Sequence, residues 1–381
     1  MGHGRRWLVP VGVCLVVVIW LAATHRRGSS ILPACAVPPN PQYTSNPAWS
    51  ADGRRAALLG RSGDQCFGIV LDTAGPQPRV LRCQLLPSDV GTNPALDATG
   101  GRLFYVTNYK ADPRIWSMSV ANGRAEEVAH GASPSPSPVG TGLTYSSMGD
   151  QRPRACNLLV MHGNGPARPV GPALRFVSPS AWSPDGKRIA YAGWQLVEDA
   201  GSRGGYRETG QAVAVALADG SDPREMIVAS LGPETLSENG RLAYRAVKWA
   251  DADTVVFAVA QGDASGRFVF AIDAYDLRTG TTRTLLPFGE DQVLTKYGSP
   301  RLSDQARRVL WQVPPDTSGV YRLADLAAGT SGVLQFPEEV YLGLSPEGGR
   351  ILAVGRTTGA LYLARPSAHD PQWRIEQLQL R

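Results

Sequence analysis

The chain has 381 residues, enough for two average domains or one large all-β domain. An apolar content of 43% and a charged content of 19% are typical of a globular protein and argue against a disordered chain. The net charge of +5 arises at the N-terminus: removing Arg5, Arg6, Arg26 and Arg27 from the 38 basic residues leaves 34 against 33 acidic residues. The remaining body is nearly neutral, so we expect no nucleic-acid binding, which needs a clustered basic face.

An uncharged apolar run, WLVPVGVCLVVVIWLAA, occupies residues 7–23 and is near the short end of what spans a bilayer. Trp7 and Trp20 lie near its ends, where aromatic side chains favour the membrane interface. The run is followed by a poor signal-peptidase site. We therefore expect residues 1–27 to be a retained signal anchor with a transmembrane helix at about 7–23. A cleaved signal peptide is the main alternative, and a buried core helix is the other.

Residues 28–45, GSSILPACAVPPNPQYTS, contain four prolines, which predicts a stiff, extended spacer that holds the body off the membrane. Two arginines lie on each side of the apolar run, so the positive-inside rule does not set its orientation. The cysteines of the body favour an oxidising compartment. We expect a membrane-anchored protein whose body is periplasmic or extracellular.

The rest of the chain, residues 46–381, is repetitive, and each repeat has the pattern of four short strands. A short apolar stretch, often with Pro, precedes an Asp-Gly or similar turn, an apolar strand and a second hairpin. Related segments begin at Asn46, Asn93, Ser135, Ser178, Tyr244, Gly298 and Tyr341, about 42 to 66 residues apart. This spacing suits the four-stranded blade of a propeller. We predict an all-β fold, a seven-bladed propeller of four-stranded antiparallel blades, preceded by the one N-terminal transmembrane helix.

Two kinds of residue recur at fixed places in the segments. The turn residues are expected to be structural, because Gly accepts a positive φ and Asp bonds the local backbone; they are Asp52, Gly53, Asp185, Gly186 and Gly348. Calcium binding by the aspartates is the alternative. The aromatic position is occupied by Trp49, Trp182 and Trp249, which we expect to pack between blades. Stacking on a ligand at the channel mouth is the alternative for these three.

The pattern Pro-x-Trp-Ser-Pro-Asp-Gly-Lys-x-Ile-Ala-Tyr strongly resembles the TolB-like, or WD40-like (PD40), β-propeller repeat. Residues 179–191 match it almost throughout, with one extra residue before Trp182, and residues 49–53 and 344–348 match well. The third, fifth and sixth segments are degenerate. The resemblance covers roughly residues 45–381 and implies the fold but no function. The best-known member of the family is a six-bladed periplasmic protein, so its particular partners are not carried over to seven segments.

The longest interval, between the fourth and fifth segments, contains the polar, Gly-rich stretch QLVEDAGSRGGYRETGQ, residues 195–211. It predicts a protruding loop between the second and third strands of blade 4. Insertions in repeat folds gather on one face and contact partners there. The candidate contact residues are Glu198, Asp199, Arg203, Tyr206 and Arg207. A solvated loop without a role is the alternative.

The chain has five cysteines, of which Cys14 lies in the apolar run. Cys66 and Cys83 flank a predicted hairpin, and paired strands would bring them close enough for a disulfide. Spacing alone does not say whether Cys35 and Cys156 are paired. Zinc is not expected, because the sequence has no Cys-x-x-Cys motif.

The sequence shows no motif for catalysis, a metal or a cofactor. Its five histidines have no partner at metal-ligand spacing, and it lacks a Gly-x-Ser-x-Gly elbow. Glu338 and Glu339 are adjacent, so on a strand they would face opposite sides rather than form an acid pair. We therefore expect a non-catalytic, monomeric scaffold of the cell envelope that binds a protein or a glycan. A propeller enzyme of the lactonase, hydrolase or lyase type, with a site at the channel mouth, is the alternative.

Overall fold

A computed structural model describes the chain over the following residues: 29–38, 41–75, 77–91, 93–109, 111–147, 158–171, 175–176, 180–198, 206–220, 226–231, 243–262, 268–289, 292–294, 300–313, 319–367 and 373–379. The predicted anchor, residues 1–27, lies outside these ranges. Within them, no helix is long and apolar enough to cross a membrane.

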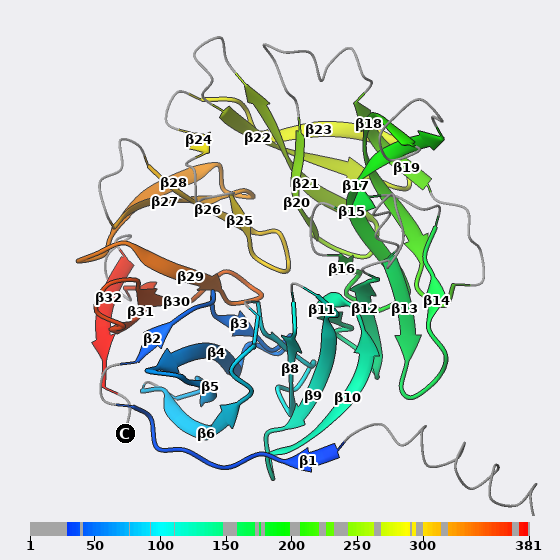
Figure 1. The fold of residues 1–381 in the computed structure, drawn as a ribbon. Helices are drawn as coiled ribbons and strands as arrows, with labels where there is room; N and C mark the ends of the chain where they lie inside the picture. The colour runs from blue at the N-terminus through cyan, green and yellow to red at the C-terminus, as the bar shows by residue number, and fades with distance from the viewer. Residues whose placement is uncertain are drawn as a thin grey trace, which may run out of the picture.

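Seven antiparallel sheets stand around a common centre, and each sheet is one blade (Figure 1). Blade 1 contains β2 (Gln42–Tyr43), β3 (Ala48–Trp49), β4 (Arg55–Ser62), β5 (Gln65–Asp72) and β6 (Arg79–Leu86). Blade 2 contains β7 (Ala95–Leu96), β8 (Arg102–Thr107), β9 (Arg114–Ser119) and β10 (Arg124–His130), joined at its outer edge by β1 (Ser29–Ile31). Blade 3 contains β11 (Ala132–Pro136), β12 (Gly142–Ser146), β13 (Leu158–His162) and β14 (Arg168–Pro169).

The remaining blades follow the same order from the centre outward. Blade 4 contains β15 (Arg175–Phe176), β16 (Ala181–Trp182), β17 (Arg188–Glu198), β18 (Tyr206–Leu217) and β19 (Met226–Leu231). Blade 5 contains β20 (Ala243–Trp249), β21 (Thr254–Gly262), β22 (Phe268–Asp276), β23 (Thr281–Leu286) and β24 (Val293–Leu294). Blade 6 contains β25 (Arg301–Leu302), β26 (Arg308–Gln312), β27 (Val320–Asp325) and β28 (Thr330–Gln335). Blade 7 contains β29 (Val340–Leu344), β30 (Ile351–Gly355), β31 (Leu361–Pro366) and β32 (Trp373–Leu378).

This arrangement confirms the predicted seven-bladed propeller of four-stranded antiparallel blades. The second strand of each blade is apolar on both faces because both faces are covered by neighbouring blades. All five residues of β30 are buried, for example, and Leu58 of blade 1 packs in one cluster with Leu352 of blade 7. Burial between blades, rather than within one sheet, therefore supplies the core.

The recurring turn has one hydrogen-bonding scheme. In blade 4, the Ser183 hydroxyl donates to Asp185 Oδ1 (2.6 Å) and accepts from the Arg188 N–H (2.9 Å), and Gly186 takes a φ of 70°. In blade 1, Ser50 makes the same contact with Asp52 (2.6 Å), and Gly53 has a φ of 67°. Only glycine adopts this φ without strain, which explains the recurring Asp-Gly pair.

The prolines predicted that residues 28–45 form a stiff, extended spacer, but part of this segment docks on the propeller. Residues 29–38, which we call the strap, lie along the outside of blades 2 and 1 (Figure 1). Strand β1 pairs with β10, and the Cys35 N–H donates to the Cys83 carbonyl of β6 (3.1 Å). Proline limits a segment to extended backbone but does not keep it away from a sheet edge.

The strap supplies one of the two cysteines of the disulfide, which therefore differs from the predicted one. The bond joins Cys35 to Cys83, whereas Cys66 is a free, buried thiol, so the predicted Cys66–Cys83 bond is wrong. Strands β5 and β6 pair in a register that places Cys83 opposite Ile69 and Cys66 opposite Leu86. The hairpin is thus offset by three residues from the register that the prediction required. Cys156 lies outside the described residues.

Candidate functional site: a cationic pocket between blades 6 and 7

The three tryptophans of the repeat lie between blades and not in a pocket. Each indole N–H donates to a carbonyl of the innermost strand of the preceding blade: Trp49 to Gly343 (3.0 Å), Trp182 to Ser135 (2.8 Å) and Trp249 to Ala181 (2.9 Å). The turn residues Asp52, Gly53, Asp185, Gly186 and Gly348 lie at the ends of blades 1, 4 and 7, where the first strand turns into the second.

The insertion in blade 4 is mostly strand. Glu198 ends β17, Tyr206 and Arg207 begin β18, and the two strands pair as far as Glu198 opposite Tyr206. Asp199 and Arg203 lie outside the described residues. The insertion therefore extends the central hairpin of blade 4 beyond Trp194, where the pairing with β15 ends.

A pocket of about 220 Å³ lies where blade 6 meets blade 7, close to the start of blade 1. Arg301 comes from β25, Tyr321 from β27, and Tyr341 from β29, while Arg356 directly follows β30. Asn46, which precedes β3, completes the polar lining. Two further polar residues, Glu339 and Gln312, also line the pocket. The apolar part of the lining consists of Leu310, Trp311, Val340 and Leu342.

The pocket lies at the same end of the ring as the extended hairpin of blade 4. The innermost strands β25 and β29 begin at the pocket, and the second strands β26 and β30 end there. In blade 4 the second strand, β17, ends at the extended hairpin. Since successive strands are antiparallel, both features lie opposite the Asp-Gly turns.

Arg356 and Glu339 neutralise each other inside the pocket. A guanidinium nitrogen of Arg356 forms an ion pair with Glu339 Oε1, and the guanidinium carbon lies 4.9 Å from the ring centre of Tyr341. Burial is the largest single effect and lowers the pKa of Arg356, but the hydrogen bonds and charges of Glu339 and Tyr341 together outweigh burial and raise that pKa. The Glu339 carboxylate is thus held by a cation and is not a free base.

Tyr321 joins the two blades through its hydroxyl. The hydroxyl donates to the Val340 carbonyl (3.2 Å) and accepts from the Val340 N–H (3.3 Å). Burial raises the pKa of Tyr321, so the phenol stays neutral at physiological pH. Its hydrogen-bonding capacity is used within the fold.

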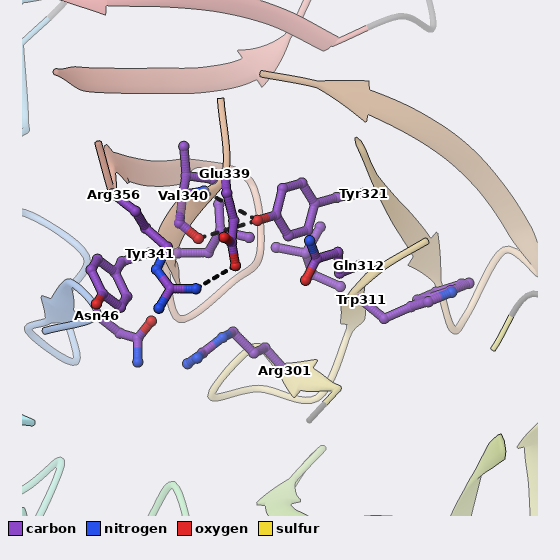
Figure 2. Close-up of a pocket in the computed structure, with 11 residues that line it drawn as sticks. Asn46, Arg301, Trp311, Gln312, Tyr321, Glu339, Val340, Tyr341 and Arg356 are labelled. Carbon is purple, nitrogen blue, oxygen red and sulfur yellow. Dashed lines mark hydrogen bonds and ion pairs between the residues drawn. The ribbon is translucent and has the colours of Figure 1, made fainter. Parts of the chain in front are cut away.

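Arg301 and Asn46 differ from these groups because their polar atoms lack protein partners within the described residues. The guanidinium of Arg301 has neither a hydrogen bond nor an ion pair there, and burial lowers its pKa. Arginine nevertheless stays protonated in proteins. The buried Oδ1 of Asn46 likewise has no hydrogen-bond partner among these residues. Figure 2 shows Arg301, Arg356 and Asn46 pointing into the same space from three elements.

This inventory is suited to binding an anion. Two guanidiniums face one carboxylate, which leaves one positive charge uncompensated in a partly desolvated site. Arginine presents a planar set of donors to a carboxylate or phosphate and does not exchange protons near neutral pH. Within the described residues, no group of three or more His, Cys, Asp or Glu side chains could hold a metal ion.

The sequence analysis missed Arg301, Arg356 and Asn46. A signal for Arg301 was present: in Pro-Arg-Leu-Ser it occupies the place that Ala48 and Ala181 hold in the better-conforming segments. Lys248 holds the same place in the fifth segment, so a charge there occurs in two of the seven segments. Glu338 and Glu339 directly precede β29 and do not lie on a strand; Glu338 accepts from the Thr357 N–H (2.9 Å), and Glu339 pairs with Arg356.

No protein-family profile matches the chain, and no curated protein sequence does. Solved structures match it in fold. A prolyl endopeptidase structure aligns with a TM-score of 0.60 at 12% identity, over 89% of this chain and 50% of that chain, so this chain spans half the length of that protein. An oligogalacturonate lyase in complex with manganese aligns with a TM-score of 0.58 at 13% identity, over 89% and 97%.

The β-propeller domain of the Trilobed protease from Pyrococcus furiosus aligns with a TM-score of 0.56 at 10% identity, over 90% of this chain and 97% of that chain. Its description reports an open velcro topology. A TolB structure from Acinetobacter baumannii also matches, at 15% identity and a TM-score of 0.44. The likenesses to the prolyl endopeptidase, the oligogalacturonate lyase and the Trilobed protease domain show the propeller fold. The likeness to the TolB-like repeat therefore stays a resemblance.

Proposed function

We propose that the protein is a membrane-tethered, extracytoplasmic binding module of the cell envelope, and that its propeller recognises an anionic group of a partner without changing it chemically. The observation that carries this proposal is the unpartnered guanidinium of Arg301 in the pocket between blades 6 and 7. Arg301 is half-buried, and a partly desolvated charge without a protein partner is costly to the fold. Such a cost is typical of a site that a ligand completes.

Three further features support the proposal. The only carboxylate among the described residues that line the pocket is Glu339, which is bound to Arg356, so the pocket offers an anion holder rather than an acid and base. The extended hairpin of blade 4 lies at the same end of the ring and enlarges the surface for a partner. The Cys35–Cys83 disulfide favours an oxidising compartment, in agreement with the apolar run at residues 7–23.

The test uses the full chain, purified in detergent, immobilised, and exposed to a solubilised envelope extract. We expect wild type and the control Arg283→Met, on the exposed outer strand of blade 5, to retain the same component. Arg301→Met should retain at least about tenfold less, because a charge-assisted hydrogen bond contributes about 1.5–3 kcal/mol. Equal retention by wild type and Arg301→Met would overturn the proposal, because recognition of the partner would then not depend on the pocket.

The same experiment separates binding from catalysis. Mass spectrometry of the retained component before and after incubation should show the same covalent structure. A cleaved or eliminated product that Arg301→Met no longer forms would instead establish the alternative, a propeller enzyme.

A further inference from the structure

We infer that the pocket between blades 6 and 7 binds the C-terminal residue of a polypeptide, with the terminal carboxylate on Arg301 and the N–H of the same residue donating to Asn46 Oδ1. This inference rests on the proposed binding function and names the chemical class of the ligand.

The first step is the charge. Glu339 already balances Arg356, so the pocket has one uncompensated positive charge, that of Arg301. A single carboxylate balances this charge, whereas a phosphate monoester carries nearly two negative charges at neutral pH. The fork of donors on a guanidinium matches the two oxygens of a carboxylate. A monoanionic carboxylate is therefore the favoured group.

The second step is the acceptor. Asn46 Oδ1 is buried and has no hydrogen-bond partner in the described part of the chain, so a ligand donor would satisfy it. A simple fatty acid has no donor beside its carboxylate. The last residue of a polypeptide has one, its backbone N–H. Asn46 and Arg301 enter the pocket from different blades and point into the same space (Figure 2).

The third step concerns the aromatic side chains of the lining, which a sugar ring would need for stacking. Tyr321 uses its hydroxyl on Val340, and Arg356 stacks against the ring of Tyr341. Trp311 is 4% exposed and packs edge-on against Phe270. Each of the three aromatic side chains in the described lining is therefore engaged within the protein, which disfavours stacking of a sugar ring. An acidic sugar, which shares the carboxylate, is thus the weaker match.

The fourth step is size. The cavity of about 220 Å³ is smaller than the range of about 300–1,000 Å³ typical of sites for drug-sized ligands. It suits one residue, with its side chain against Leu310 and Leu342. The preceding residues of a partner would leave the pocket toward the end of the ring that carries the hairpin of blade 4.

The test measures binding of defined probes to the full chain in detergent by calorimetry. The peptide Ac-Ala-Ala-Leu with a free carboxylate should bind, and its C-terminal amide should bind at least about tenfold more weakly. N-acetylleucine should bind more tightly than 4-methylpentanoate, which keeps the carboxylate and the side chain but lacks the N–H. Asn46→Ala should abolish this second difference alone, while Arg301→Met should abolish binding of every acid and Arg283→Met should change nothing.

Two outcomes would overturn the inference. Equal binding of the free acid and the amide would exclude the carboxylate contact. Arg301-dependent binding of glucuronate or inorganic phosphate, without binding of the peptide acids, would assign the pocket to another anion and leave the proposed binding function intact. The proposed function is tested by the retention experiment instead, and it fails if wild type and Arg301→Met retain the envelope component equally.

Discussion

The indole N–H of Trp49 donates to the carbonyl oxygen of Gly343 at 3.0 Å, across 294 residues of sequence. This bond joins the first blade to the last. Within the described residues the two blades share no strand, because every strand of blade 7 comes from residues 340–378 and β1 pairs with blade 2. Arg350 adds donation to the Gly53 and Thr73 carbonyls (2.6 Å each). The ring therefore closes through side chains and not through strand exchange.

Trp49→Phe should lower the free energy of unfolding by about 1–3 kcal/mol, because it leaves the Gly343 carbonyl without its donor at a buried seam. Trp182→Phe should have a similar cost, since it breaks the same contact between blades 3 and 4. The control is Trp373→Phe on the outer strand of blade 7, whose indole N–H has no recorded partner within the described residues. Chemical denaturation of the three variants compares them, and an equal loss for Trp373→Phe would argue against the hydrogen bond as the cause.

Gly343→Ala should destabilise the closure of the ring. A Cβ at this position would lie 2.3 Å from the Pro47 carbonyl oxygen of blade 1, so the two blades would have to move apart. We expect a loss of about 1–3 kcal/mol in the free energy of unfolding. Gly332→Ala is the matched control, because a Cβ there meets nothing within 4 Å, and it should leave the melting temperature unchanged or raise it slightly.

Removing the disulfide should release the strap. The bond closes a loop between residues 48 positions apart, and Cys35→Ser should lower the free energy of unfolding by about 2–4 kcal/mol. Reducing agent should destabilise wild type and have no effect on this variant. Cys66→Ala serves as the control, since it should keep the sensitivity to reducing agent. If Cys66→Ala abolished that sensitivity instead, the bond would involve Cys66.

Arg301→Met should raise the melting temperature while it abolishes ligand binding. The guanidinium has no partner within the described residues, so replacing it with an apolar side chain of similar length removes its desolvation cost. Arg356→Met should have the opposite effect on stability, because it leaves Glu339 without its cation. Thermal unfolding in the absence of ligand measures the melting temperatures of both variants against wild type. A lower melting temperature for Arg301→Met would show that this charge stabilises the fold.

Asp185 should contribute to stability at neutral pH and lose that contribution in acid. The hydrogen bond from Ser183 lowers the pKa of Asp185, so folding favours the ionised form. A carboxylate with a depressed pKa in the folded state stabilises above its unfolded pKa of about 3.9 and ceases to do so as the pH falls through the folded value. The difference in stability between wild type and Asp185→Asn should therefore be constant from pH 5 to 7 and shrink below about pH 4. A difference that grows in acid would contradict the assignment.

The repeat could be recognised from sequence because its determinants are local. Ser183, Asp185 and Gly186 lie within four positions and form their turn with one another. Proximity along the chain makes such a pattern visible wherever the fold copies it. The disulfide was assigned wrongly for the opposite reason, because the register of β5 on β6 and the docking of the strap are both tertiary facts.

The candidate site could not be predicted from the sequence. Asn46, Arg301 and Arg356 are separated by more than 50 residues, and no spacing rule connects them. Arg301 replaces the alanine found at residues 48 and 181, but Lys248 does so too, so this substitution did not single out the site. Arg356 and Glu339 look like ordinary surface residues until β29 and β30 bring them together.

By itself, the amino-acid sequence determined the repeating unit and therefore the class of fold, since turns and apolar strands follow from neighbouring residues. The number of blades also follows, because each copy is a complete sheet. Only the tertiary structure decided how the ring closes, where the strap binds, which cysteines pair and which charges meet in one pocket. These depend on contacts between blades, and contacts between blades are set by the packing of whole sheets.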